Sequence, residues 1–473
     1  MSARLAVFVV VPTLLAGCAS FSPDGGMGEV AHDVKRETGA SVVKIDSAEA
    51  ARKAQERVTA LLAEPLSADA AVQVALLGNR DLQAAYNDLG ISEADYVQQS
   101  LPPNPTFSFM NYGGTGVVDF ELRLIQDILG LITLPERSKI AAEHFEHAKH
   151  GAVQKTLALA GDVRRAWVRT IAAERQVRFL EEARRTADTS ARLMAKLGEA
   201  GGGDQLEQAE IAAFYAELSV RLGQARLVAR RQREALTRLL GLWGSDVDYR
   251  LPDDLPRLPG EPEAMADVEA EAIRRRVDLV MARHDVVALA RSLKLTRATR
   301  YVSMLQLAGF VNNENANPLT TTNTPITRGG GALEIEIPIF DTGEARERKA
   351  RETYMRALNR LAAKAVNARS EARIAYDAYR STWDIARFYE TRVLPLRQVV
   401  SKQMALRYGT AVLANEAMRV DYFRVLIDER ARITASAAAL DARRDFDLAA
   451  IDLQAALTYG ANAGTSATPG MAD

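Results

Sequence analysis

The sequence predicts a mainly α-helical protein built from two structural repeats, each with a β-hairpin and a pair of very long helices. Matched residues in the two halves of the 473-residue chain reveal the repeats. An offset of 209 pairs Arg137 with Arg346, Glu143 with Glu352 and Trp167 with Tyr376, and an offset of 197 pairs Asp81 with Asp278. A period of about 200 residues is too long for a stacked solenoid unit, so we expect a duplicated unit of domain size.

Alternating apolar and charged residues predict the strands. Val117–Leu124 and Leu333–Ile339 both alternate in this way, which is typical of a strand with one wet face. We expect their partners at Thr106–Tyr112 and Tyr301–Phe310, across turn-rich loops. Two hairpins per chain cannot close a barrel and would leave exposed edges, so the missing strands must come from other copies of the chain.

The two faces of such a barrel have different expected roles. Four charged residues should line its lumen because their apolar neighbours must face lipid: Asp119, Glu121, Glu334 and Glu336. Five aromatic residues could form a girdle at the bilayer interface, with ordinary strand packing as the alternative: Phe107, Phe109, Tyr112, Tyr301 and Phe310.

Long segments without proline predict the helices. The chain holds no proline between Pro135 and Pro252, which allows two antiparallel helices separated by a break at Gly198–Gly203. Helices of about 60 residues would each be roughly 90 Å long. In the second half, Pro395 should kink the first long helix, and a turn is expected at Tyr408–Thr410.

The segments before the first hairpin are predicted from their polar and apolar pattern. Residues 21–39 are rich in Gly and Asp and are expected to be extended or loosely ordered. An amphipathic helix is expected at Ala48–Leu62, and one further helix at about Ala68–Gln99 after an N-cap at Ser67.

The N-terminus has the layout of a secretory signal. Arg4 is followed by an apolar segment from Leu5 to Leu15 and then by Leu15-Ala16-Gly17-Cys18. The pattern resembles a bacterial lipoprotein signal, in which Cys18 becomes the lipidated first residue, and Ala19 after it resembles sorting to the outer membrane. The alternative is an ordinary signal peptide with an incidental cysteine.

Composition excludes several functions. Sixty basic and sixty-one acidic residues leave a net charge of −1, so no global field recruits nucleic acid. No window is apolar enough for a membrane-spanning helix, so the chain would enter a bilayer only as strands. The sequence contains no nucleophile with its base, no phosphate-binding glycine loop after a strand and no metal-spaced cysteines, and we expect neither an enzyme nor a cofactor.

One histidine cluster could suggest a metal site. His144, His147 and His150 are spaced by three, but the outer pair lies about 240° apart around a helix. We therefore predict a solvated helix surface and no metal site, with His144 and His147 as weak candidates. Trp167, Tyr376 and Trp383 are expected to pack between helices.

The chain resembles the TolC-like outer-membrane efflux family, as a lipoprotein member. Five short segments in family order carry the resemblance: Asn79–Leu82 with its second copy, Leu239–Leu242, Glu336–Gly343, Leu394–Leu396 and Arg407–Thr410. The resemblance implies a homotrimer whose three copies form a twelve-stranded β-barrel, continued by an α-helical barrel across the periplasm. It also implies a periplasmic adaptor protein and an inner-membrane pump, expected to be proton-driven, as partners.

Together these patterns divide the chain. The expected parts are a signal peptide at 1–17, an N-terminal leader and equatorial segment at 18–65, a first repeat at 66–250, a Pro-rich linker at 251–262, a second repeat at 263–460 and a disordered tail at 461–473. Within the first repeat, the strands are expected at about 105–124 and the helical hairpin at about 136–241; within the second, at about 301–339 and about 344–458.

The resemblance also places the functional residues at the helix tips. The candidates for a periplasmic gate are Asp204, Glu207, Asn415 and Glu416. The candidates for adaptor contacts are Gly198, Gly201, Gly202, Gly203, Gly409 and Thr410. Carboxylate rings repeated by threefold symmetry would favour cations and repel one another on opening.

The expected function is a passive exit duct for drugs or metal ions, anchored in the outer membrane of a bacterial cell and extending into the periplasm. The alternatives are an outer-membrane channel for type I protein secretion, a periplasmic adaptor and a coiled-coil scaffold lipoprotein. An adaptor should show one helical hairpin set in small β domains, not two hairpins per chain with wet-dry strands.

Overall fold

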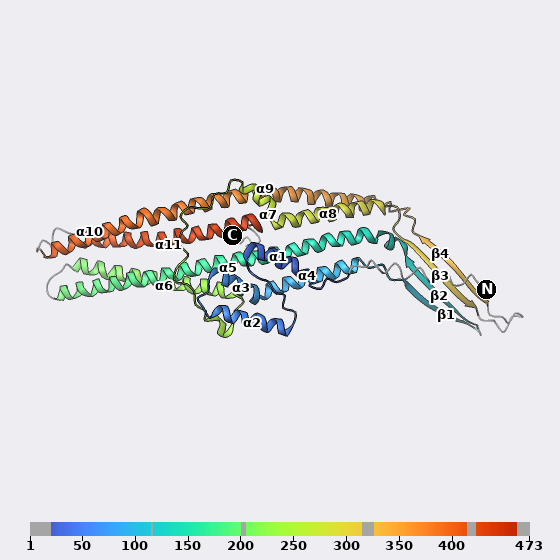
Figure 1. The fold of residues 1–473 in the computed structure, drawn as a ribbon, viewed down its shortest axis with the longest axis horizontal. Coiled ribbons are helices and arrows are strands. Elements are labelled where there is room, and N and C mark those ends of the chain that lie inside the picture. Colours follow the sequence, from blue (N-terminus) through green and yellow to red (C-terminus); the bar gives the residue numbers. More distant parts are fainter. Residues whose placement is uncertain (1–19, 115–116, 200–204, 315–325, 414–421, 461–473) are drawn as a thin grey trace. The chain divides into compact units, whose positions relative to one another are not determined.

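A computed structural model describes residues 20–114, 117–199, 205–314, 326–413 and 422–460. The helices in these ranges are α1 Met27–Thr38, α2 Ala48–Leu62, α3 Ala68–Gly78, α4 Arg80–Gln99, α5 Ile128–Glu199, α6 Gln205–Leu240, α7 Val268–Arg275, α8 Val277–Ala298, α9 Glu344–Phe388, α10 Leu394–Leu413 and α11 Tyr422–Thr458 (Figure 1). A short 3₁₀-helix lies at Gly244–Val247, and a π-helix at Tyr389–Val393 joins α9 to α10. The strands are β1 Thr106–Gly114, β2 Val117–Asp127, β3 Leu305–Glu314 and β4 Ile326–Ile335.

The chain divides into two compact units. The strand unit comprises the described parts of Met1–Val30, Tyr86–Ala152 and Asp278–Ala365. The helical unit comprises Ala31–Ala85, Val153–Val277 and the described part of Val366–Asp473. The long helices α5 and α9 contribute residues to both units. Within the described ranges, none of the helices combines the length and the apolar composition that crossing a membrane would require.

The strand unit contains an antiparallel sheet in the order β1-β2-β3-β4. Its register confirms the wet-dry pattern, because Phe107 pairs with Leu124 on one face and Met110 pairs with Glu121 on the other. The four predicted strands are therefore present, and they share one sheet.

The second hairpin differs from the prediction in its bounds. The fourth strand was expected at Leu333–Ile339, but β4 begins at Ile326 and ends at Ile335. Gly329–Gly331, assigned to a loop from the sequence, pair with residues of β3. A Cβ at Gly330 would lie 2.7 Å from Cζ of Phe310, so a larger residue at this position would require the Phe310 ring to move.

Residues 21–39 were expected to be extended or loosely ordered, and this prediction was wrong. They contain α1, in which Val30 and Val34 are fully buried one turn apart. Before the helix, the Asp24 carboxylate accepts hydrogen bonds from the backbone N–H groups of Gly26 and Gly28, at 3.2 and 2.7 Å. A local cap and two buried valines thus order a segment whose composition suggested a loop.

The single helix predicted at Ala68–Gln99 is two helices. Asn79 has extended backbone angles, and its side-chain oxygen accepts a hydrogen bond from the Leu82 N–H, which caps α4. The second repeat breaks at Arg276, the position 197 residues later, between α7 and α8. The break at Asn79 was not predicted, although Gly78 directly precedes it.

Prolines lie inside two of the long helices. The helix α5 starts at Ile128, so Pro135 lies inside it instead of before it. In the second repeat a kink was expected at Pro395, and the π-helix Tyr389–Val393 ends two residues before that proline. A wider turn is a common cause of a bend in a long helix.

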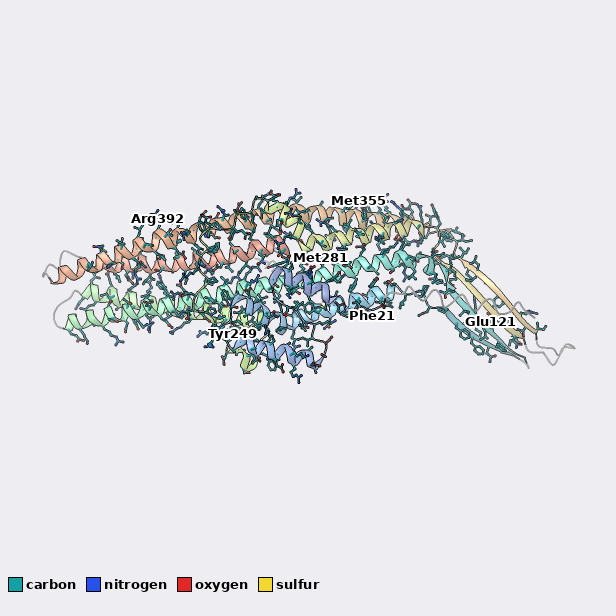
Figure 2. All side chains as sticks on the ribbon, in the orientation of Figure 1. Phe21, Glu121, Tyr249, Met281, Met355 and Arg392 are labelled. Carbon is teal, nitrogen blue, oxygen red and sulfur yellow. The ribbon has the colours of Figure 1, made fainter. Side chains whose placement is uncertain are left out.

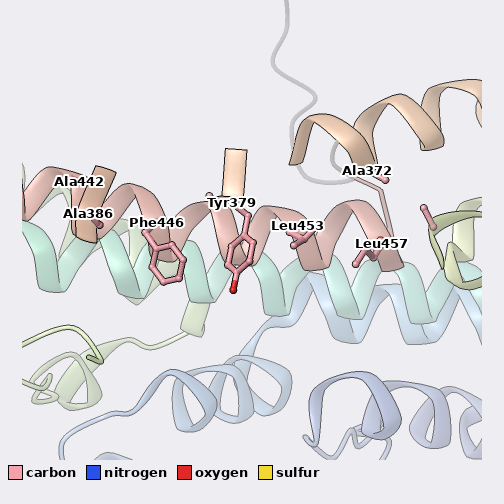
Figure 3. Packing of buried hydrophobic residues seen from close by; sticks show 9 residues of the cluster. Ala372, Tyr379, Ala386, Ala442, Phe446, Leu453 and Leu457 are labelled. Atoms are coloured by element: carbon pink, nitrogen blue, oxygen red, sulfur yellow. The ribbon is translucent and has the colours of Figure 1, made fainter. Parts of the chain in front are cut away.

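The core of the helical unit consists of small and aromatic side chains between helices. In Figure 3, Tyr379 of α9 lies near Phe446 of α11, with ring centroids 5.4 Å apart. A second cluster joins α5, α6 and α11: Leu180, Ala183, Ala187, Phe214, Leu218, Leu222, Leu426 and Ile433. The many alanines allow the helix axes to approach closely.

Candidate functional site

The sheet exposes a wide apolar face. Its large side chains with more than two fifths of their surface exposed are Phe107, Phe109, Leu124, Leu307, Val311, Leu333 and Ile335. Phe107 is 65% exposed and Leu333 is 63% exposed, although both are in regular strands. An apolar surface of this size, continuous across four strands, needs a partner or a lipid environment.

The opposite face of the sheet carries the charged residues that the sequence predicted. Asp119, Glu121 and Arg123 alternate along β2, and Figure 2 shows Glu121 on this strand. Arg123 forms an ion pair with Glu334 of β4, and the register places the small side chain of Ala308 between them. Asp119, Glu121 and Glu334 thus lie on one face, as expected.

Glu336 lies beyond the sheet. It follows the last residue of β4, and its carboxylate accepts a hydrogen bond of 2.6 Å from the hydroxyl of Ser303. Of the aromatic residues, Phe107 and Phe109 lie on the exposed apolar face, whereas Phe310 pairs with Arg123 on the charged face. Phe310 therefore cannot belong to a girdle on the apolar face.

The helix tips are described in part. Gly198 lies in the last turn of α5, and Glu207 lies in the first turn of α6. The helix α10 continues through Gly409 and Thr410 to Leu413, so the turn predicted at Tyr408–Thr410 is wrong. Six other candidates, namely Gly201, Gly202, Gly203, Asp204, Asn415 and Glu416, lie outside the described residues, as does Cys18.

Two histidines, His147 of α5 and His284 of α8, lie near carboxylates of the opposite helix. His147 Nε2 lies 3.5 Å from Asp285 Oδ2, and His284 Nδ1 lies 2.8 Å from Glu143 Oε2. Burial lowers the pKa of His147 below its usual value. No group of three or more ligand side chains that could hold a metal ion occurs in the described residues.

The first residues after the expected lipid anchor are held in the strand unit, a feature that the sequence did not suggest. The Ser22 N–H donates a 2.7 Å hydrogen bond to Glu93 Oε1. Lys149 of α5 forms ion pairs with Glu29 of α1 and with Glu146, the latter at 2.9 Å. The described chain begins at Ser20, two residues after Cys18. The hydrogen bond between Ser22 and Glu93 therefore holds the chain close to the proposed anchor.

No protein-family model matches the chain, and no curated protein matches it. Its fold, however, matches solved structures of outer-membrane channels. CusC, described through its folding and transmembrane channel formation, matches with a TM-score of 0.68 at 18% identity, over 86% of this chain and 92% of that chain. The outer-membrane channel OprN matches with a TM-score of 0.67 at 18% identity, over 92% and 96%.

A third match is the Neisseria gonorrhoeae MtrE outer membrane channel in its open state, with a TM-score of 0.64 at 17% identity over 86% of this chain and 89% of that chain. The chain thus has the fold of TolC-like outer-membrane channels, and the resemblance predicted from its sequence is confirmed at the level of the fold. These matched structures are described as channels and not as enzymes.

Proposed function

We propose that the chain is an outer-membrane channel, the passive exit duct of a tripartite efflux pump for small molecules such as drugs or metal ions. The observation that carries this proposal is a four-stranded sheet with one exposed apolar face and one charged face, in a fold shared with outer-membrane channels. Lipid would cover the apolar face, and water in a lumen would solvate the charged face.

The edges of the sheet support the proposal that the channel is a trimer. In the part of the chain that the structure describes, β1 and β4 are the edge strands of this sheet, and edge strands can pair with a strand of another chain. Pairing β1 of one copy with β4 of the next closes a barrel, and three copies supply twelve strands. In that barrel Asp119, Glu121 and Glu334 line the lumen, and Glu336 lies at its end.

The helical hairpins would continue the duct across the periplasm. As a passive duct, it would depend on an inner-membrane pump, expected to be proton-driven, and on a periplasmic adaptor. The adaptor would contact the helix tips near Gly198, Gly201–Gly203, Gly409 and Thr410. Lipidated Cys18 would anchor each copy to the outer membrane.

Conductance of the purified full-length chain in planar lipid bilayers tests the proposal. We expect stable pores and a protein mass that corresponds to three copies of the mature chain. A protein that remains soluble without detergent and forms no pores would exclude the channel.

Two neighbouring substitutions provide a matched control. Phe107→Glu adds a charge to the exposed apolar face, whereas Ser108→Glu adds it to the charged face opposite Arg123. A charge facing lipid costs up to about 2 kcal/mol at each site, so Phe107→Glu should sharply reduce insertion and Ser108→Glu should leave it near the wild-type level. Equal effects would show that the apolar face does not contact lipid.

A further inference from the structure

A cationic cavity lies between the end of α8 and the beginning of α9. Its volume is about 360 Å³. Three basic side chains and several hydroxyls line it, including Arg300, Arg346, Lys349, Ser292, Thr296 and Thr353. None of the lining residues that the structure describes is acidic.

The carboxylates near the cavity leave part of this positive charge uncompensated. Glu347 is shared, because Arg300 Nη1 and Arg297 Nε each lie 3.0 Å from one of its oxygens. Arg346 has only a longer contact, with 3.4 Å between its Nε and Asp341 Oδ2. The Lys349 ammonium has no ion-pair partner among the described residues, and its side chain is exposed.

The first repeat provides an internal comparison. There, the Arg137 guanidinium donates a 3.2 Å hydrogen bond to Gln99 Oε1. The matched positions in the second repeat are Arg346 and Thr296, and the shorter threonine donates its hydroxyl to the Ser292 carbonyl of its own helix at 2.9 Å. Arg346 therefore lacks the neutral hydrogen-bond partner that Arg137 has in the first repeat.

A second difference between the repeats adds charge at the same place. The residue matched to Lys349 is Ile140, at the offset of 209. The second repeat thus has a lysine where the first has an apolar residue, next to the arginine that lacks its glutamine. Both changes make the second site more attractive to an anion.

We propose that this cavity binds a phosphate-class oxyanion, either a phosphate ester of a lipid headgroup or free phosphate. A guanidinium donates paired N–H groups to two oxygens, and an ammonium adds a point charge, which together suit a tetrahedral anion with several acceptor oxygens. The lining residue Arg300 precedes the start of β3 at Leu305 by five residues, so a lipid headgroup could reach the cavity if the sheet inserts in a membrane. Only this lipid source rests on the proposed function.

The test uses the full-length protein purified in an uncharged sugar detergent. Inorganic phosphate is titrated calorimetrically, and retention of phosphatidylglycerol is compared with that of diacylglycerol by native mass spectrometry. We expect wild-type protein to bind at least one phosphate-bearing probe. The double variant Arg346→Ala, Lys349→Ala should bind it about tenfold more weakly or not at all.

Two further variants test whether weaker binding by the double variant reflects loss of the cavity site or only a loss of positive charge or of folded protein. Arg348→Ala removes a neighbouring exposed charge on α9 that does not line the cavity, and binding should not change. Thr296→Gln restores the glutamine of the first repeat, should engage Arg346, and should weaken binding without removing any charge.

The two probes distinguish the sources of the anion. Binding of inorganic phosphate indicates a soluble ligand, whereas retention of phosphatidylglycerol alone indicates a headgroup. The proposal is wrong if wild-type and double-variant proteins bind both probes equally, or if Arg348→Ala weakens binding as much as the double variant. Neither result would affect the conductance test, so the channel and this site can fail separately.

Discussion

Asp447 is a largely buried carboxylate in the helical unit. Its Oδ2 atom lies 3.7 Å from Nε of Arg443, one turn earlier on α11, and has no hydrogen-bond partner among the described residues. Burial raises the pKa of Asp447 to about 6, although the charge of Arg443 opposes this shift. The folded chain therefore binds this proton more tightly than the unfolded chain does.

This raised pKa predicts a defined dependence of stability on pH. Protonation of Asp447 stabilises the fold, an effect that is complete below the ordinary value of 3.8 and is lost as the pH rises through about 6. Asp447→Asn mimics the protonated form. We expect it to raise the free energy of unfolding at pH 7.5 by on the order of 2 kcal/mol, measured by thermal unfolding followed with circular dichroism.

Near pH 3.8 the stabilisation by Asp447→Asn should largely disappear. Asp445→Asn is the control, because Asp445 is about half exposed and pairs with Arg444. It should change stability little at pH 7.5. A stabilisation by Asp447→Asn that is the same at both pH values would contradict a role for ionisation.

At the level of elements, the strands were predicted correctly where apolar and charged residues alternate clearly, and the prediction failed where glycines interrupt this alternation. The first hairpin has one charged strand and one aromatic strand, and its position was predicted within a few residues. In β4 the segment Gly329–Gly331 has no side chains to alternate. What makes it a strand is pairing with β3, a contact between segments that local pattern cannot reveal.

The contact between Phe310 and Gly330 predicts that a substitution at Gly330 is more harmful than the same substitution at Gly331. Gly330→Val should displace the Phe310 ring and reduce assembly of the sheet, because a Cβ there would lie 2.7 Å from the ring. The amount of the proposed trimer in membranes, measured by native electrophoresis, should fall by several-fold.

Gly331→Val is the matched control, since its Cβ would meet only the Ala308 carbonyl oxygen at 3.6 Å. The double variant Phe310→Ala, Gly330→Val should recover part of the lost assembly. If Gly331→Val were as harmful as Gly330→Val, loss of glycine in general, and not the Phe310 contact, would explain the defect.

The breaks within helices also depended on contacts distant in sequence. Gly78 lies against the backbone of Leu240 and Gly241, where a Cβ at Gly78 would be 2.7 Å from the Leu240 carbonyl oxygen. Asn79 then donates its side-chain amide to the carbonyl oxygen of Leu239 at 3.0 Å. A helix continuing through Asn79 would lose its cap and this contact, so the chain breaks there.

At the scale of the molecule, the duplication extends to individual hydrogen bonds. Trp167 of α5 donates its indole N–H to the Leu66 carbonyl oxygen at 2.8 Å. Its counterpart Tyr376 of α9 accepts a hydrogen bond of 3.2 Å from the Met265 N–H. Both aromatic residues hold the segment that precedes α3 or α7, so the expected packing role of Trp167 and Tyr376 includes a polar contact.

The proposed trimer predicts an effect of charge at the helix tips. Threefold symmetry would repeat Asp204 and Glu416 as rings of carboxylates at the narrow end of the duct. Asp204→Ala or Glu416→Ala should raise single-channel conductance about two-fold or more in planar bilayers. Lys196→Ala, which changes a charge on α5 outside these candidates, should not. Unchanged conductance in both tip variants would exclude the proposed gate.

The sequence alone determined the duplication, the long helices and the two-faced strands, because periodicity and proline placement act locally along the chain. Only the tertiary structure decided that residues 21–39 include a helix, that Gly329–Gly331 belong to β4, and that Arg346 and Lys349 meet in one cavity. These features depend on side chains that approach one another across loops or between helices. Buried side chains, close contacts between backbones and basic side chains that gather in one cavity arise only when the segments pack against one another.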